Sequence, residues 1–185
     1  AFVLFSKYKA DFLILETGLG GRLDATNIIQ KKLISIITSI GIDHEEYLGN
    51  TLKKIAREKL GIIKNSENII IAKQSKEVDD FIYKKLKNLD NVFYFNRNYG
   101  FKIINNKQFI FRFKKNKKII RRPSLQGLHQ IENASTALTT AMLLKENKYN
   151  IKLNSLGKSI YNTKWPGRIE KVKFKNKYVI FDGSH

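Results

Sequence analysis

Residues 13–27 read LILETGLGGRLDATN, and we expect this stretch to determine how the chain is organised. An apolar run ends in one carboxylate, Glu16, and a glycine-rich segment follows it. Open α/β sheets bind ligands at the carboxyl ends of parallel strands, so a buried strand that ends in an acid and a glycine turn is typical of a binding edge. Glu16 is therefore a candidate site residue. The alternative is a strand-end acid paired with a neighbouring base.

The glycines match neither of the common phosphate-binding loops. The dinucleotide fingerprint needs glycine at its first, third and sixth places, and Leu23 holds the sixth place after Gly18. The chain also contains no Gly-x-x-x-x-Gly-Lys-Ser/Thr sequence. We therefore predict no phosphate-cradling loop in these residues.

The composition indicates a globular protein with one good core. The chain has 185 residues, 42% of them hydrophobic, and only two prolines, which allows one core and the start of a second domain. Its apolar runs are shorter than the roughly 20 residues of a membrane span, so no membrane partner is predicted. The absence of cysteine excludes disulfides, thiolate metal sites and cysteine nucleophiles, and is typical of a cytoplasmic protein.

The formal charge of +19 raises the possibility of a polyanionic partner. Lysine supplies 28 of the 35 basic residues, and the bases are interpreted as scattered along the chain. A nucleic-acid reader more often interleaves arginine with aromatic residues on one face. The densest basic run, RFKKNKKIIRR at residues 112–122, is interpreted as a solvated hairpin. We favour a lysine-rich composition and predict no specific nucleic acid; a basic nucleic-acid-binding module remains the alternative from another class.

The order of apolar patterns predicts an α/β fold with a mostly parallel sheet flanked by helices. Strand patterns alternate with helical ones: strands are expected at residues 11–16, 33–38, 68–72 and 92–95, and helices at residues 1–9, 51–64 and 76–89. Short alternating runs with Asn-rich turns predict an inserted antiparallel region at residues 99–120.

The last third of the chain predicts two helices and then a domain boundary. Helical patterns cover residues 130–147 and 153–161, and Trp-Pro-Gly-Arg at residues 165–168 interrupts the chain. Two strands are expected at residues 169–174 and 178–181. We expect a central domain over residues 1–166 and the start of a C-terminal domain over residues 167–185.

Two further groups of polar residues have the character of site residues. Asp43 and His44 follow the second apolar run, at the same kind of strand end as Glu16, and could supply oxygen and imidazole ligands to Mg²⁺. The alternative is that His44 caps a turn. In the helix expected at residues 51–64, Lys59 falls on the apolar stripe. This position indicates a lysine whose charge is paired, suppressed by burial or removed by modification. The alternative is that its side chain extends along the apolar surface and reaches solvent.

The expected helix at residues 130–147 opens with polar side chains. His129, Gln130 and Asn133 could face a phosphate or a base at its N-terminus, and ordinary capping is the alternative. Arg168 and Asp182 flank the expected domain boundary and could close on a ligand from the other side.

Five segments together resemble the folylpolyglutamate synthase and dihydrofolate synthase family of the Mur ligase superfamily. They occur in the family's order over nearly the whole chain: ETGLGGRLDATN at residues 16–27, TSIGIDHEEYLGNTLKKIAREKLGIIK at 38–64, LQGLHQIENASTAL at 125–138, WPGRIE at 165–170 and FDGSH at 181–185. The resemblance implies a Mur-ligase-type central ATP-binding domain and ATP-dependent amide ligation. A pteroate or folate carboxylate is phosphorylated, and the amine of L-glutamate then displaces phosphate.

The same resemblance implies roles for individual residues. Glu16 and His44 are similar to the family's Mg²⁺ ligands, for which the resemblance implies two ions, and Lys59 is similar to its carbamylated lysine; all three are expected to be catalytic. Leu23, Asp24 and Ala25 match the pterin-substrate loop, and Asn133, Arg168 and Asp182 match the ATP contacts. Asp43, His129, Gln130 and His185 are expected to support them.

The family's phosphate loop precedes the region that matches this chain, and its C-terminal domain continues beyond it. We therefore expect a central fragment that is inactive alone, from a monomeric protein that uses dihydropteroate or reduced folate, L-glutamate and ATP. The main alternative is a Mur-type ligase that joins amino acids to a cell-wall nucleotide, and the GLGGRLDATN loop argues against it. A partial reading frame without activity is the third possibility.

Overall fold

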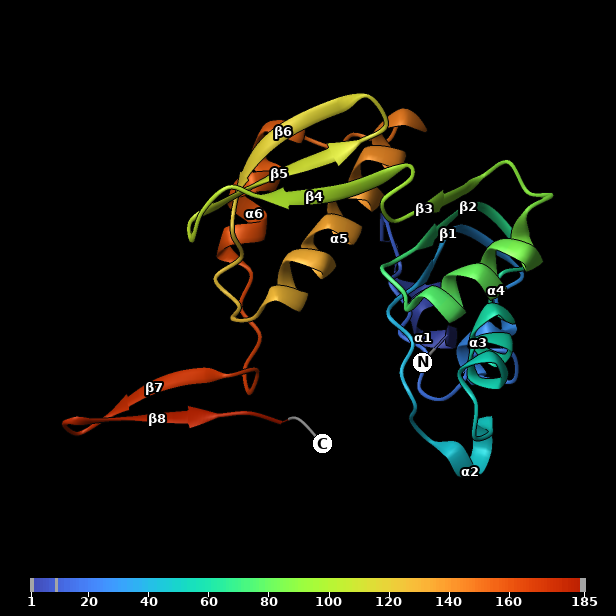
Figure 1. Cartoon of the computed structure of the whole chain (residues 1–185), viewed down its shortest axis with the longest axis horizontal. Helices are drawn as coiled ribbons and strands as arrows, with labels where there is room; N and C mark the ends of the chain where they lie inside the picture. The colour runs from blue at the N-terminus through green and yellow to red at the C-terminus, as the bar shows by residue number, and fades with distance from the viewer. Residues whose placement is uncertain (1, 9, 184–185) are drawn as a thin grey trace.

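A computed structural model describes residues 2–8 and 10–183 of the chain (Figure 1). Its first sheet is parallel and three-stranded, with the order β1 (Lys31–Ile37), β2 (Asn65–Ile71) and β3 (Val92–Tyr94). The helices α2 (Glu45–Leu48) and α3 (Leu52–Leu60) connect β1 to β2, and α4 (Lys76–Leu86) connects β2 to β3. This alternation of strands and helices confirms the predicted α/β class.

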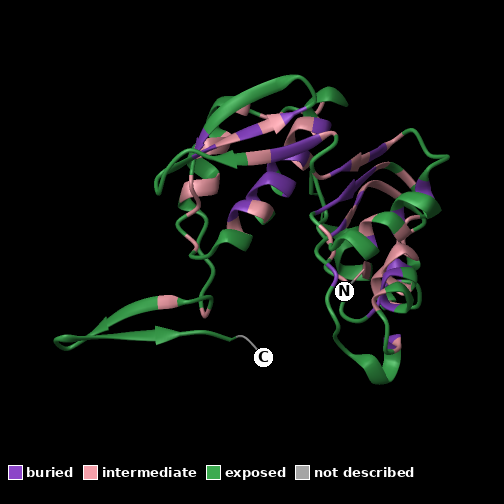
Figure 2. Cartoon of the chain, in the orientation of Figure 1, coloured by how far each residue is buried: buried purple, intermediate pink, exposed green. Residues whose placement is uncertain are grey.

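Both faces of the parallel sheet are covered where β1 and β2 are apolar, in their second halves. Successive side chains of a strand point to opposite faces. Ile69 and Ile71 therefore pack in one core with α3 and α4, whereas Ile70 packs in a second core with α5 (Leu128–Glu146). Figure 2 shows the buried residues concentrated in these layers.

The second core continues into an antiparallel sheet, so that α5 lies between the two sheets. This sheet has the order β4 (Tyr99–Ile103), β5 (Gln108–Phe113) and β6 (Asn116–Arg121). The hydroxyl of the fully buried Tyr99 donates to the carbonyl of Ile71 at 3.1 Å, which ties β4 to the end of β2. The predicted antiparallel region is thus confirmed, as a separate sheet stacked on α5.

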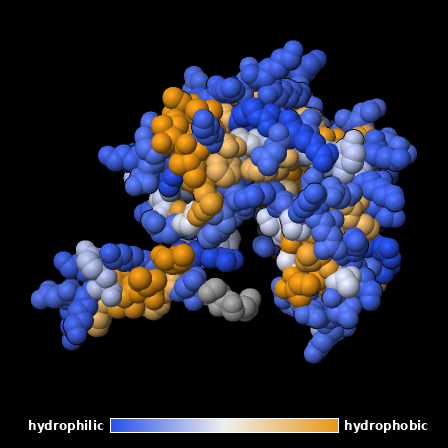
Figure 3. All heavy atoms as spheres, viewed as in Figure 1, coloured by the Kyte–Doolittle hydropathy of each residue, from blue (hydrophilic) through white to orange (hydrophobic). Residues whose placement is uncertain are grey.

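The remaining elements are short. They are α1 (Phe2–Lys7), the 3-10 turns η1 (Ala25–Ile28) and η2 (Leu153–Ser155), α6 (Leu156–Asn162), and the antiparallel pair β7 (Glu170–Phe174) and β8 (Lys177–Phe181). The β7–β8 hairpin stands away from the other layers (Figure 1) and is exposed along nearly its whole length. Figure 3 shows hydrophobic residues gathered on it. None of the helices in the described part of the chain is both long and apolar enough to cross a membrane.

One predicted strand is wrong. Residues 11–16 form neither a strand nor a helix, and Ile14 is 93% exposed. Within the described residues β1 pairs only with β2, so residues 11–16 have no neighbouring strand with which to share backbone hydrogen bonds. The apolar composition of the run favours a strand, but a strand forms only where a neighbouring strand can pair with it.

Candidate active site

The glycine-rich loop lies against α3 at a distance that only glycine permits. A Cβ on Gly21 would approach the backbone oxygen of Glu58 to 2.8 Å and the Cα of Lys59 to 3.1 Å. Gly20 has a φ of 66°, and a Cβ there would approach the side chain of Leu48 in α2 to 2.8 Å. The loop that follows Glu16 therefore contacts both α2 and α3.

Arg22 fastens this loop to α3 through backbone and side chain. Its N–H donates to the backbone oxygen of Glu58 at 2.9 Å. Its Nε lies 3.1 Å from both carboxylate oxygens of Glu58. Glu58 directly precedes Lys59, so the loop is held at the turn of α3 that carries the candidate lysine.

Asn27 anchors the far end of the loop. Its side chain is buried and donates to the backbone oxygens of Arg22 and Gly61, at 2.9 and 3.1 Å. Two amines complete the anchor, because Lys32 donates to the side-chain oxygen of Asn27 and Lys64 to its backbone oxygen. Burial, together with the nearby charge of Lys64, lowers the pKa of Lys32.

The carboxylate of Asp24 holds the loop in shape from within. One oxygen accepts the N–H groups of Gly18 and Leu19, both at 3.0 Å, and the other accepts the N–H and hydroxyl of Thr26. The Thr26 hydroxyl and these backbone N–H groups lower the pKa of Asp24 to about 2. Leu23 and Ala25, its neighbours, are exposed. Asp24 therefore stabilises the conformation of the predicted pterin-substrate loop through hydrogen bonds within the loop.

His44 begins α2 in a left-handed backbone conformation, with a φ of 50°. Such a conformation is uncommon for a residue with a side chain and is often found at functional sites. Its N–H donates to one oxygen of Asp43 at 2.9 Å, and its Nε2 lies 3.6 Å from the other oxygen. His44 holds the N-cap position, as the capping alternative predicts, and its backbone oxygen accepts from the N–H groups of Tyr47 and Leu48, but the imidazole makes no capping hydrogen bond.

Lys59 is half-buried, whereas Lys53, Lys54 and Arg57 of the same helix are exposed. Its Cα lies under Gly21, and its amine makes no ion pair with any acid among the described residues. The structure therefore agrees with the expected position of Lys59 near the buried side of α3. The carbamylation of its amine stays a prediction.

Glu16 precedes the glycine loop in sequence, whereas His44 begins α2 and Lys59 lies in α3, the two helices that the loop contacts. The carboxylate of Glu16 is exposed and makes no hydrogen bond or ion pair within the part of the chain that the structure describes. The same residues contain no group of three or more histidine and acidic side chains close enough to hold a metal ion. The contacts of the loop with α2 and α3 are formed, but among the described residues the candidate ligands do not form a metal-binding cluster.

One set of polar contacts, which joins the ends of the parallel strands, was not predicted from the sequence. The side chain of Gln74 donates to the carbonyl of Thr38 and accepts from the N–H of Ile40, while Ser39 donates to the carbonyl of Lys73. These contacts link the segment after β1 to the segment after β2. No local pattern predicts them, because each pair is more than 30 residues apart in sequence.

The first turns of α5 lie near this edge. Lys73 donates to the carboxylate of Glu132 at 2.7 Å, which draws the start of α5 towards the end of β2. Asn133 is exposed on the next position of α5. His129 and Gln130 contact each other at 3.1 Å, and no side chain caps the helix.

Arg168 and Asp182, which flank the expected domain boundary, follow and precede two residues whose backbones are hydrogen-bonded. The N–H of Gly183 donates to the carbonyl of Gly167 at 2.7 Å, which brings together the neighbours of Arg168 and Asp182. Both side chains are exposed. His185, the last predicted supporting residue, lies outside the described residues.

Comparison with known proteins identifies the family. A family model described as the Mur ligase middle domain matches residues 2–141. The chain is 38% identical to the dihydrofolate synthase/folylpolyglutamate synthase of Bacillus subtilis, and 38% identical to the enzyme of that name from Buchnera aphidicola. Each alignment covers 100% of this chain, but only 44% and 43% of the relative. The chain thus spans less than half the length of these curated relatives.

Solved structures agree with this result. A folylpolyglutamate synthase from Thermotoga maritima superimposes with a TM-score of 0.80 at 28% identity, over 100% of this chain and 42% of that one. The E. coli FolC in complex with DHPP and ADP gives a TM-score of 0.74 at 27% identity, over 91% and 38%. These matches confirm the resemblance found in the sequence, and the chain belongs to the Mur ligase middle-domain family.

Proposed function

We propose that this chain is the central part of an ATP-dependent ligase that joins L-glutamate to dihydropteroate, to reduced folate, or to both. The observation that supports the proposal is the docking of the glycine loop, which follows Glu16 in sequence, on Leu48 of α2 and on Glu58 and Lys59 of α3. The names of the relatives, and of structural neighbours bound to ATP analogues, folate or DHPP, support the same reaction.

Mg²⁺ fits the donor groups that these segments supply. The ion prefers oxygen ligands, retains several waters and commonly takes one or two protein carboxylates together with substrate phosphates. The unpaired carboxylate of Glu16 and the imidazole of His44 could hold such ions. Lys59 as an amine cannot ligate Mg²⁺, whereas its carbamate would offer oxygen. When bound, the metal offsets the negative charge of the transferring phosphoryl group.

The chain's own residues would then act by binding and orientation. Leu23, Asp24 and Ala25 would face the pterin end of the substrate, with the carboxylate of Asp24 fixing the shape of their loop. Asn133, Arg168 and Asp182 would contact ATP. No residue need act as a covalent nucleophile, because the glutamate amine attacks the acyl phosphate directly and phosphate leaves.

The proposal includes the setting of the whole protein. We propose a monomer that acts in the cytoplasm on small molecules, without a specific nucleic-acid or membrane partner. The boundary near Gly167 would separate the central domain from a glutamate-ligase domain that begins with the β7–β8 hairpin. The 185 residues alone should not turn over, and ATP-dependent glutamate addition by the isolated chain would contradict this.

The test uses the protein expressed together with its flanking coding sequence. It is assayed for glutamate addition to dihydropteroate, to a reduced folate and to a uridine-nucleotide acceptor. We expect activity with one or both pterin substrates. Activity with the uridine nucleotide alone would overturn the proposal in favour of a cell-wall ligase.

Lys59 is tested by Lys59→Ala, with Lys53→Ala as the matched control on the exposed side of α3. Loss of a group that helps to stabilise the charge of the transferring phosphoryl group should lower kcat by about 10²-fold or more. The control variant should leave kcat unchanged. Intact-mass analysis under carbon dioxide should show a carbamate on the wild type that Lys59→Ala lacks. Equal kcat in the two variants would exclude Lys59 from catalysis.

A further inference from the structure

The positive charge of the chain is concentrated in one segment. Residues 91–131 contain ten lysines and arginines and neither aspartate nor glutamate. The remaining 25 basic and 16 acidic residues carry a balance of +9, so these 41 residues supply +10 of the net +19. The bases themselves are spread along the chain, and the excess arises because this segment contains no acidic residue. The segment includes the whole antiparallel sheet β4–β5–β6.

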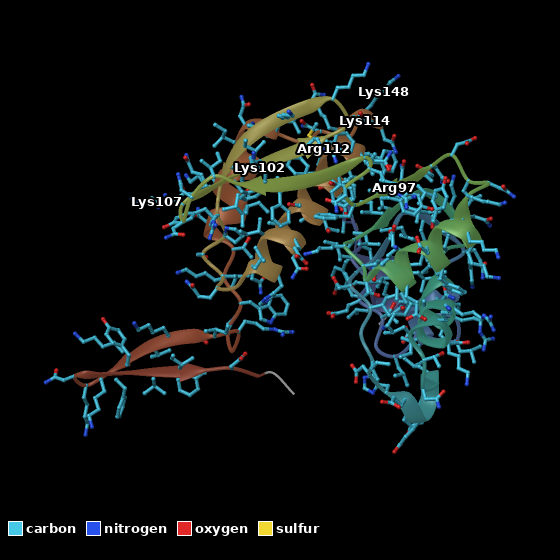
Figure 4. The ribbon with its side chains drawn as sticks, in the orientation of Figure 1. Arg97, Lys102, Lys107, Arg112, Lys114 and Lys148 are labelled. Carbon is cyan, nitrogen blue, oxygen red and sulfur yellow. The ribbon has the colours of Figure 1, made fainter. Side chains whose placement is uncertain are left out.

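Strand register places three of these cations on the outer face of that sheet. In β5 the buried Phe109, Phe111 and Phe113 face α5, so Ile110 and Arg112 face outward. Directly paired residues share a face. One outward row therefore contains Gly100, Arg112 and Lys117, and the next contains Lys102, Ile110 and Ile119. Figure 4 labels Lys102 and Arg112 on this sheet, with Lys107 and Lys114 near its ends.

These rows enclose a hollow of about 240 Å³, lined by Asn96, Gly100, Phe101, Lys102, Ile110, Arg112 and Lys117. Gly100 leaves room there, because a Cβ at this position would have its nearest neighbour, the side-chain oxygen of Asn96, at 3.5 Å. Pockets for drug-sized ligands typically measure about 300–1,000 Å³. The hollow therefore suits a compact ligand.

Arg112 is fixed in this hollow without being neutralised. Its guanidinium donates to the backbone oxygens of Arg97, Asn96 and Tyr99, at 3.0, 2.8 and 3.3 Å. Three of its five N–H groups are used in this way, and carbonyl oxygens carry no net charge. A guanidinium that is already positioned loses little conformational freedom when it binds an anion.

Among the described residues that line the hollow, none is acidic. Asp79 of α4 and Glu146 of α5 reach the edge of this region, but they pair with Arg97 and Lys114, outside the lining. Arg112 lies directly opposite Lys117, and like charges in directly opposite positions destabilise a sheet. A bound anion would relieve this repulsion.

We propose that this hollow is a binding site for a compact phosphate-type anion, held by Arg112, Lys102 and Lys117. Phosphate is recognised by arginine through paired N–H groups and by lysine through its point charge. The ligand would be free phosphate or pyrophosphate, or the phosphate group of a larger metabolite. The site lies on a different sheet and helix layer from the glycine loop and does not depend on the proposed ligase reaction.

The test measures pyrophosphate and glycerol 2-phosphate binding to the chain by calorimetry, in buffer free of other multivalent anions. The double variant Lys102→Gln/Lys117→Gln should weaken pyrophosphate binding by about tenfold or more, because it removes two of three cations. The matched control, Lys84→Gln/Lys85→Gln, removes the same charge from exposed positions of α4 and should change affinity less than about twofold.

A second variant separates the shape of the hollow from its charge. Gly100→Leu fills the hollow and keeps every cation, so it should abolish binding, whereas Gly100→Ala should fold normally and weaken binding less. Equal weakening by the α4 control and the double variant, or full affinity in Gly100→Leu, would show diffuse charge attraction and overturn the proposal. The proposal would also be overturned if neither pyrophosphate nor glycerol 2-phosphate bound with 1:1 stoichiometry. Pyrophosphate binding alone would assign a free anion, and equal binding of the monoester a phosphate group on a larger molecule.

Discussion

The antiparallel sheet and the glycine loop are both held against a helix, but by different interactions. The sheet packs on α5 through large buried side chains, among them Phe109 and Phe113, whose exposures are 0% and 1%. The loop docks on α3 through backbone approach and polar contacts, namely Gly21 over Glu58, Arg22 to Glu58, and the internal bonds of Asp24. Apolar burial contributes most of the free energy of folding, whereas exposed polar contacts contribute little each. The scaffold should therefore be stable and the candidate site easier to disturb.

The largest effect is expected in the sheet. Phe109→Ala would leave a cavity beside Phe101, whose ring centroid lies 6.2 Å away, and should lower the free energy of unfolding by about 3–5 kcal/mol. Urea unfolding followed by circular dichroism measures this. Ile119→Ala, at a position 60% exposed on the same sheet, is the control and should change stability by less than about 0.5 kcal/mol. Similar losses in both variants would mean that the sheet is not packed as described.

An intermediate effect is expected where the loop meets α3. Gly21→Ala would force a Cβ against the backbone oxygen of Glu58 and should cost about 1–3 kcal/mol, while also displacing the loop from Lys59. Gly41→Ala, whose Cβ would meet no atom within 4 Å, is the matched control. Thermal unfolding of the two variants measures the difference. If Gly21→Ala unfolded like Gly41→Ala, the close approach of loop and helix would be contradicted.

The smallest effect is expected from Asp24, and it depends on pH. The folded-state pKa of about 2 lies below the ordinary 3.8, so the charged carboxylate stabilises the loop above pH 3.8 and loses this effect as the pH falls towards 2. Because the group lies near the surface, we expect less than about 1 kcal/mol. Asp24→Asn should therefore be less stable than the wild type at pH 7, and the gap should narrow below pH 3.8. Urea unfolding at several pH values gives both curves; a constant gap would contradict the role of the charge.

Much of the scaffold was predictable because its signals are local. The isoleucine-rich second halves of β1 and β2 differ from the alternating burial of β5, and this difference separates a sheet covered on both faces from one covered on a single face. The same reasoning failed for residues 11–16, since a strand also needs a partner that the run itself cannot specify. The buried role of Asn27 and the pairing of Arg22 with Glu58 had no signal, because the contacting residues are distant in sequence.

By itself, the sequence determined the class of fold, the family and the identities of the candidate site residues, since periodicity and motif are properties of neighbouring residues. Only the tertiary structure decided that Asp24 organises its own loop, that the glycines are needed for contact with α3, and that Lys102, Arg112 and Lys117 share one hollow. The reason is physical: hydrogen bonds and electrostatic interactions act over a few ångströms in space, and the register and packing of the strands and helices determine which distant residues come within that range.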